Sequence, residues 1–177
     1  ALRYDGVLGT RRINCICGKT PPGSDPRAPR ATLIENLRHA GAELAKAGVT
    51  LMIEPVNTRD VPGVYLSGSQ QAAELIGDVG LPNVKIQYDC YHMQVMEGDL
   101  ATKIRRWLPH VGHIQIAGVP GRNEPNIGEI NYEFLFKLLE ELKYDGWIGC
   151  EYRPAQTTTA GLGWLYKLID RRPAAAS

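Results

Sequence analysis

The amino-acid sequence predicts an α/β fold in which helices cover a parallel sheet. Short apolar runs rich in valine and isoleucine alternate with amphipathic helical patterns along the 177 residues. This alternation requires crossover connections between parallel strands. With 44% hydrophobic and 22% charged residues, the composition is typical of a globular chain and excludes a disordered one. We expect one domain over residues 1–173 and a disordered tail at 174–177.

Five apolar runs predict the strands of this sheet. Each run is short, and each is followed by a helical pattern, as expected of strands that are buried on both faces. The runs are residues 12–17, 49–55, 84–89, 112–117 and 147–152. Residues 1–11 are expected to be the end of a helix that enters the first strand.

Helices are predicted between the strands and after the last one. The first covers residues 31–47, where Thr32 and Glu35 are a candidate capping box and Gly48 is the stop. A leucine pattern at 162–169 marks the last helix. The candidate N-caps of the three helices between them are Ser69, Asp99 and Asn131.

Charge and cysteine content limit the classes of function that the sequence allows. A formal net charge of +1 gives no global field to hold nucleic acid or an anionic membrane, and no window approaches the roughly 18 apolar residues of a membrane span. All four cysteines lie in strand-like apolar runs, so we expect reduced core thiols and a soluble, cytoplasmic protein. They are Cys15, Cys17, Cys90 and Cys150.

Oxygen-bearing side chains occur at the carboxyl ends of four successive strands. They are Glu54, Asp89, Gln115 and Glu151. The intervals are 35 residues (54 to 89), 26 (89 to 115) and 36 (115 to 151), close to the roughly 30 residues per unit of an eightfold parallel barrel. In a barrel these strand ends share one rim, so we expect the four side chains to converge.

Convergence of three carboxylates favours a bound cation. Buried like charges either raise one another's pKa values or require a metal, and an all-oxygen set suits Mg²⁺ or Mn²⁺ better than zinc. A single acid at a strand end would mean only that strand ends meet water. Four in succession favour a divalent metal site formed by Glu54, Asp89, Gln115 and Glu151.

Two residues near this rim are candidates for substrate binding. His92 follows Asp89 where the chain leaves its strand, and it either donates to a substrate oxygen or is a loop histidine bonded to backbone. Arg122 lies in the long loop 118–131 and is a candidate fork for a substrate carboxylate, or a solvated loop arginine. His113 shares the facing parity of Gln115 and is expected to be a packed or supporting residue.

Six segments, taken together, resemble the hydroxypyruvate isomerase family. They are Ile-Glu-Pro-Val-Asn at 53–57, Asp-Cys-Tyr-His-Met-Gln at 89–94, His-Ile-Gln-Ile-Ala at 113–117, Val-Pro-Gly-Arg-Asn-Glu-Pro at 119–125, Gly-Glu-Ile-Asn-Tyr at 128–132 and Gly-Cys-Glu-Tyr at 149–152. The resemblance covers nearly the whole chain, and the segment 119–125 is the most discriminating. This family belongs to the xylose isomerase-like TIM barrels.

The resemblance implies the interconversion of hydroxypyruvate and tartronate semialdehyde through an enediolate. It matches Glu54 and Glu151 to the proton donor and acceptor, and Glu54, Asp89, Gln115 and Glu151 to the metal ligands. His92 and Arg122 match substrate-contacting positions. Such a proton transfer needs an acid and a base, and a metal that polarises the substrate oxygens. The sequence does not say which glutamate is the base.

The chain is shorter than a complete barrel of the family that it resembles. A complete barrel of this class has eight strands in about 250 residues, so we expect a barrel truncated at its amino end to about five strand–helix units. Two open sheet edges would then allow a homo-oligomer.

Four alternatives stay open. The first is a 2-oxo-tetronate isomerase, whose substrate is one carbon longer, and the second is a dehydratase of the inosose type. The third is a catalytically impaired barrel that acts as an interaction module. The fourth is a phosphodiester-cleaving enzyme of the endonuclease IV type, which is disfavoured because it needs a histidine-rich zinc cluster and the chain has 4 histidines.

Overall fold

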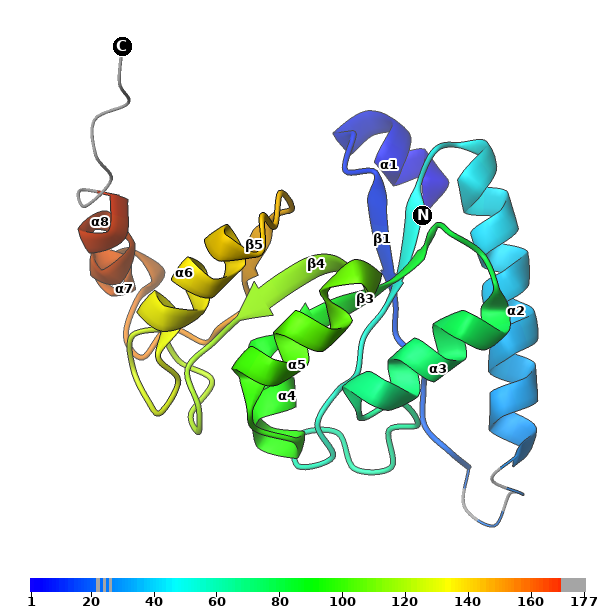
Figure 1. The fold of residues 1–177 in the computed structure, drawn as a ribbon, viewed down its shortest axis with the longest axis horizontal. Helices are drawn as coiled ribbons and strands as arrows, with labels where there is room; N and C mark the ends of the chain where they lie inside the picture. Colours follow the sequence, from blue (N-terminus) through cyan, green and yellow to red (C-terminus); the bar gives the residue numbers. More distant parts are fainter. Residues whose placement is uncertain (22, 24, 26, 170–177) are drawn as a thin grey trace.

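The computed structural model describes residues 1–21, 23, 25 and 27–169, and it contains a five-stranded parallel sheet (Figure 1). The strands pair in the order β1-β2-β3-β4-β5. A doubly wound sheet reverses its order at a switch point, whereas a parallel barrel keeps sequential order. The predicted α/β class and the five predicted strands are therefore confirmed. The strands are β1 Arg12–Cys15, β2 Thr50–Ile53, β3 Val84–Asp89, β4 Val111–Ile116 and β5 Ile148–Cys150.

The helices form an outer layer along one side of the curved sheet, with α2, α3, α5 and α6 following the strands in turn (Figure 1). The helices are α1 Leu2–Leu8, α2 Arg27–Lys46, α3 Ser69–Val79, α4 Cys90–Met96, α5 Leu100–Trp107, α6 Tyr132–Glu141, α7 Thr158–Gly161 and α8 Gly163–Ile169, with a short 3₁₀ helix η1 at Leu108–His110.

Alternation along the strands separates an apolar face from a polar one. Ile53, Ile86 and Ile114 are at most 1% exposed and pack in the core with the helices. The opposite parity carries polar side chains, and the register pairs Asp89 with Gln115. The sheet thus turns a row of polar groups away from the helical layer, and the candidate site lies at the end of that row.

Two of the predicted helix starts are wrong. Helix α2 begins at Arg27, so Thr32 and Glu35 lie inside it and form no capping box. Pro29 falls in the first turn, where proline is tolerated because its missing N–H has no partner in the helix. Ser69 is the first residue of α3 and not its cap, and its backbone amide donates to Glu97 at 2.7 Å.

The other predicted caps differ in outcome. Asn131 caps α6, because its side chain accepts from the Phe134 amide at 3.0 Å. Asp99 stands at the N-cap of α5, but its side chain makes no capping bond within the described part of the chain. The pattern at 162–169 begins at Leu162, the C-cap of α7, and covers all of α8. The predicted tail at 174–177 lies outside the described residues.

The four cysteines are free, as predicted, but they do not share one environment. Cys90 is buried, Cys15 and Cys17 are half-buried, and Cys150 is exposed. Because β1 and β5 are the outer strands of the described sheet, thiols near them have neighbours on one side only. The prediction of core thiols therefore holds for Cys90, holds in part for Cys15 and Cys17, which pack against the core, and is wrong for Cys150. Among the described helices, none is long and apolar enough to cross a membrane.

Candidate active site

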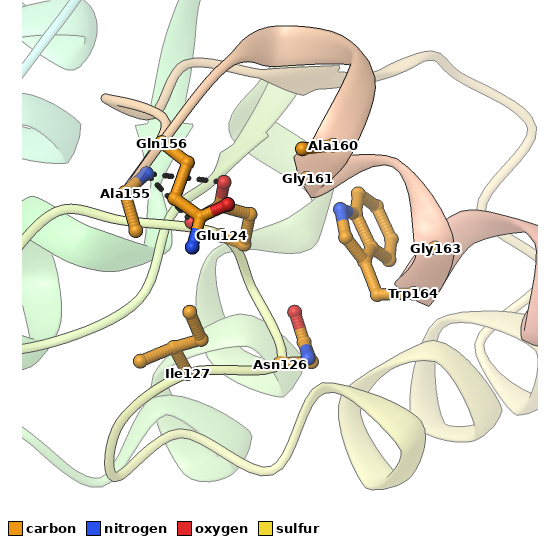
Figure 2. A pocket seen from close by; sticks show the side chains of 9 residues that line it. All are labelled: Glu124, Asn126, Ile127, Ala155, Gln156, Ala160, Gly161, Gly163 and Trp164. Carbon is orange, nitrogen blue, oxygen red and sulfur yellow. Dashed lines mark hydrogen bonds between the residues drawn. The ribbon is translucent and has the colours of Figure 1, made fainter.

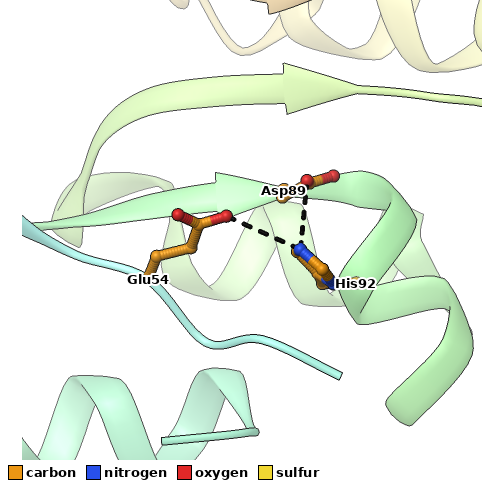
Figure 3. Close-up of side chains that lie close together, drawn as sticks. All are labelled: Glu54, Asp89 and His92. Atoms are coloured by element: carbon orange, nitrogen blue, oxygen red, sulfur yellow. Dashed lines mark ion pairs between the residues drawn. The ribbon is translucent and has the colours of Figure 1, made fainter. Parts of the chain in front are cut away.

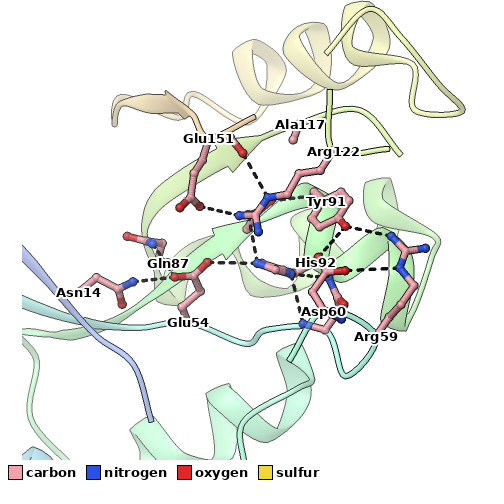
Figure 4. A network of polar contacts seen from close by, with 12 residues as sticks. Asn14, Glu54, Arg59, Asp60, Gln87, Tyr91, His92, Ala117, Arg122 and Glu151 are labelled. Atoms are coloured by element: carbon pink, nitrogen blue, oxygen red, sulfur yellow. Dashed lines mark hydrogen bonds and ion pairs between the residues drawn. The ribbon is translucent and has the colours of Figure 1, made fainter. Parts of the chain in front are cut away.

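Glu54 directly follows β2, and two neighbouring strands hold its carboxylate. Asn14 on β1 donates to Glu54 Oε2 at 2.6 Å, and Gln87 on β3 donates to the same oxygen at 2.8 Å (Figure 4). Both amides come from the strands that flank β2, so the parallel register brings them to this oxygen. Oε1 is left to face the centre of the site. Burial raises the pKa of Glu54 above its ordinary value.

Asp89 is the last residue of β3 and also the N-cap of α4. Its Oδ1 accepts from the Tyr91 amide at 2.8 Å, which caps the helix. Its Oδ2 is buried and has no hydrogen-bond partner among the described residues. Burial, together with the charge of Glu54, raises the pKa of Asp89 to about 7. One oxygen of Asp89 therefore supports the fold, and the other faces the site.

His92 lies in the first turn of α4, beside both carboxylates. Its Nε2 is 3.6 Å from Asp89 Oδ2 and 3.8 Å from Glu54 Oε1 (Figure 3). The side chain is 3% exposed, and burial with the Arg122 charge lowers its pKa to about 4. Each of these three residues offers one ligand atom within 4.8 Å of the others'. The sequence patterns did not predict α4, although Asp89 as a cap was a usable signal.

Gln115 and Glu151 stand on the neighbouring strand ends. Gln115 is the register partner of Asp89, and its Oε1 is buried with no hydrogen-bond partner in the described part of the chain. Glu151 follows β5, and its side chain is 53% exposed. It lies outside the compact group formed by Glu54, Asp89 and His92. Of the four proposed ligands, Glu54 and Asp89 lie in the compact group, Gln115 is placed beside Asp89 by the strand register, and Glu151 lies outside the group.

Arg122 lies between the exposed carboxylate of Glu151 and the buried carboxylate of Asp89. Its guanidinium Nη2 is 3.0 Å from Glu151 Oε2 and 3.6 Å from Asp89 Oδ2. The guanidinium also lies over the Tyr91 ring, 4.9 Å from its centroid. Arg122 is therefore held in the site and is not a solvated loop residue: its side chain is 17% exposed.

A network that sequence reasoning missed surrounds His92. Asn57 approaches His92 Nδ1 and donates to Asp60. Asp60 also accepts from the Tyr91 hydroxyl, to which Arg59 donates (Figure 4). Asn57 belongs to the segment 53–57 that contributes to the family resemblance, but the sequence patterns predict no role for it. Its buried position beside His92 depends on the path of the loop after β2, which strand patterns do not specify.

Two cavities adjoin this region. One, of about 430 Å³, lies on the polar face of the sheet, and His113 lines it, as expected of a residue that faces inward with Gln115. It is lined by Thr10, Arg12, Asn14, Met52, Gln87, His113 and Trp147. The other, of about 350 Å³, lies between loop 118–131 and α7–α8, where buried Glu124 accepts from the Ala155 amide (Figure 2). Neither includes Asp89, His92 or Arg122.

Known proteins resemble this chain over most of its length. The hydroxypyruvate isomerase of Escherichia coli K12 is 53% identical over 165 residues, which are 93% of this chain and 64% of that protein. The 2-oxo-tetronate isomerase of Cupriavidus necator is 50% identical over 171 residues, which are 97% of this chain and 66% of that protein. The chain therefore spans slightly less than two thirds of these relatives.

The structural comparison agrees with the sequence comparison. A crystal structure from Brucella melitensis, described as an AP endonuclease of family 2, superposes with a TM-score of 0.91 at 43% identity and covers 94% of this chain and 64% of its own. Residues 1–168 match the xylose isomerase-like TIM barrel family. With the sequential parallel sheet and the polar strand ends, this match settles the family: the chain belongs to the xylose isomerase-like TIM barrels.

Proposed function

We propose that this chain carries the catalytic rim of a hydroxypyruvate isomerase, which interconverts hydroxypyruvate and tartronate semialdehyde with the help of Mg²⁺ or Mn²⁺. The observation that carries the proposal is that His92 and Arg122 meet Glu54 and Asp89 at the carboxyl ends of the adjacent strands β2 and β3. The 53% identity to the E. coli isomerase supports the same substrate class.

The donor set fits a divalent cation. Asp89 Oδ2 and Gln115 Oε1 are buried acceptors without hydrogen-bond partners among the described residues, and leaving such oxygens unpaired is costly unless a ligand satisfies them. Oxygen donors of this kind suit Mg²⁺ or Mn²⁺. We assign the ligands as Glu54, Asp89, Gln115 and Glu151. When bound, the cation would stabilise the negative charge that develops on the substrate oxygens.

Two glutamates are proposed to move the proton. Glu54 has one oxygen fixed by Asn14 and Gln87, so its other oxygen is presented in a defined direction. Glu151 stands on the far strand and is oriented by Arg122. A pair of carboxylates on two sides of a small substrate can take a proton from one carbon and return it to the next.

His92 and Arg122 are proposed to bind the substrate. Arg122 has five N–H donors, and its hydrogen bonds to Glu151 use only Nε and Nη2. Its remaining donors can engage the substrate carboxylate. His92 Nε2 lies 3.6 Å from Asp89 Oδ2, the same oxygen that the Arg122 guanidinium approaches, so both residues border one space. The substrate is a small hydroxy-oxo acid, and neither nucleic acid nor a membrane is required.

A 2-oxo-tetronate isomerase is the second candidate, because a relative of that name is 50% identical. The same acid–base pair and the same cation would serve a substrate one carbon longer. Multi-zinc phosphodiester cleavage is less well supported, since His92 is the one histidine in the described cluster of potential metal ligands. The four free thiols favour a reducing compartment, and we propose the cytoplasm.

The test is an isomerisation assay on both substrates. Because the chain spans 64% of the E. coli relative, it is assayed beside a chimera that completes eight strands with the remainder of that protein. With Mn²⁺, the chimera should convert hydroxypyruvate, and Glu54→Gln should abolish turnover. The matched control is Glu74→Gln on the exposed surface of α3. A folded, Mn²⁺-loaded chimera that leaves both substrates unchanged would overturn the proposal.

A further inference from the structure

The hydrogen-bond pattern around His92 assigns a role to Asn57. We propose that Asn57 is a positioning residue that holds His92 in the neutral form whose Nε2 carries the hydrogen. His92 is then a hydrogen-bond donor to the substrate and not a ligand of the cation. The part of this inference that concerns the substrate rests on the proposed function, whereas the hydrogen position does not.

Two donors of Asn57 converge on one ring nitrogen. The Asn57 backbone amide lies 3.2 Å from His92 Nδ1, and the side-chain Nδ2 lies 2.7 Å from the same atom. A backbone N–H can only donate, so Nδ1 must present its lone pair. A neutral imidazole carries one hydrogen on its two nitrogens, and that hydrogen is therefore on Nε2.

The orientation of the Asn57 amide follows from its other contacts. Its Oδ1 accepts from the Asp60 backbone amide at 2.7 Å, and its Nδ2 donates to Asp60 Oδ2 at 3.2 Å. Reversing the amide would set an oxygen against the Asp60 carboxylate and an NH₂ group against the Asp60 N–H. Nδ2 is consequently the atom that faces His92.

The Arg59 guanidinium, at the end of the network far from His92, fixes the direction of these hydrogen bonds. Arg59 can only donate, and its Nη2 lies 2.9 Å from the Tyr91 hydroxyl oxygen. Tyr91 must then send its own hydrogen to Asp60 Oδ2, at 2.6 Å. Asp60 Oδ2 accepts from Tyr91 and from Asn57 Nδ2. Every hydrogen bond in this network is therefore consistent with His92 Nδ1 as an acceptor.

The opposite ring nitrogen faces the proposed ligands. Nε2 is 3.6 Å from Asp89 Oδ2 and 3.8 Å from Glu54 Oε1, distances too long for good hydrogen bonds, so its hydrogen points into the space between the carboxylates. A metal ligand would need a lone pair at Nε2. Of the three clustered residues, Glu54 and Asp89 would thus hold the cation, and His92 would offer its N–H to a substrate oxygen beside it.

Nitrogen NMR of the histidine rings tests the assignment without any turnover. The spectrum of the ¹⁵N-labelled chain should give His92 a protonated Nε2 and an unprotonated Nδ1, with the signals identified by their loss in His92→Gln. Asn57→Asp keeps the side-chain shape and the backbone donor but sets an acceptor in place of Nδ2 beside Nδ1, so a measurable fraction of the His92 rings should then carry the hydrogen on Nδ1. Asn83→Asp is the control, because Asn83 is bonded to Gly41 and Val49 away from the site and should leave His92 unchanged.

Mn²⁺ titration supplies a second measurement. His92→Gln retains an N–H donor and should keep the Mn²⁺ affinity within about twofold, while kcat in the eight-stranded chimera falls. An Nδ1-protonated ring in the wild-type spectrum, or a loss of Mn²⁺ affinity of about tenfold or more in His92→Gln, overturns the inference. Failure of the isomerisation assay with the expected ring pattern would instead overturn the proposed function alone.

Discussion

Arg122 and Glu151 form an ion pair of 3.0 Å across the mouth of the candidate site, and the same guanidinium nitrogen is 3.6 Å from Asp89. The pair connects the exposed end of β5 to the buried end of β3. If either Glu151 or Asp89 were replaced by a neutral residue, the positive guanidinium would remain near the other carboxylate. In the proposed function the guanidinium orients Glu151, and its remaining donors would bind a substrate acid.

Arg122→Lys should keep the charge but lose the planar fork and the stacking on Tyr91. Loss of one charge-assisted contact corresponds to about 1.5–3 kcal/mol, so kcat/KM of the chimera for hydroxypyruvate should fall about 10- to 150-fold. Mn²⁺ affinity should stay nearly constant, as titration will check. An equal loss with an uncharged hydroxyketone of similar size would mean that Arg122 supports the loop and does not bind the carboxylate.

Gln87→Met removes one of the two amides that hold Glu54 Oε2 while keeping the side-chain volume. Groups that orient a ligand typically affect metal affinity about 10- to 100-fold, so Mn²⁺ binding should weaken by about tenfold. Calorimetry measures the change, and Gln70→Met on α3, where the side chain contacts Glu74, is the matched control. Unaltered binding in Gln87→Met would show that this amide does not orient the carboxylate.

The thiols should differ in reactivity in the folded chain. Burial, with the neighbouring Cys15 and Glu54, raises the pKa of Cys17 to about 12, so very little of this thiol is in the reactive thiolate form at pH 8. Alkylation followed by mass spectrometry should label exposed Cys150 first and buried Cys90 last. Denaturant should remove the differences. Labelling of Cys17 as fast as Cys150 in the native chain would contradict the structure at the end of β1.

Edge exposure predicts self-association or reduced stability of the 177-residue form. Strands β1 and β5 bound the described sheet, and exposed Ile16 and Trp147 lie beside them. Sedimentation and thermal melts should show a larger species, or a lower Tm, than in the eight-stranded chimera. A stable monomer that melts like the chimera would show that the further strands are dispensable for folding.

The sequence alone predicted the parts of the fold that depend on periodicity. The five strands and the Asn131 cap follow from local patterns, and so does the sequential placement of Glu54, Asp89 and Gln115 at strand ends. Helix α4 was missed because its residues follow β3 without a loop, so that one residue, Asp89, both ends the strand and caps the helix.

Contacts between segments could not be predicted in this way. Asn14 and Gln87 act on Glu54 only because their strands flank β2, and Asn57 reaches His92 only through the fold of a loop. The start of α2 was also misplaced, since a capping-box pattern can occur inside a helix. Such pairings depend on three-dimensional neighbours that a single sequence does not reveal.

Calorimetric titration of Mn²⁺ into the chain and into Asp89→Asn tests whether these strand ends hold a divalent cation. Asparagine retains the capping oxygen that α4 needs, and it removes the negative charge at the position of Oδ2. We predict saturable binding of a single Mn²⁺ by the unchanged chain and a loss of about tenfold or more in affinity in the variant, with the fold intact by circular dichroism. Undiminished Mn²⁺ affinity in a folded Asp89→Asn protein would contradict the proposed metal site.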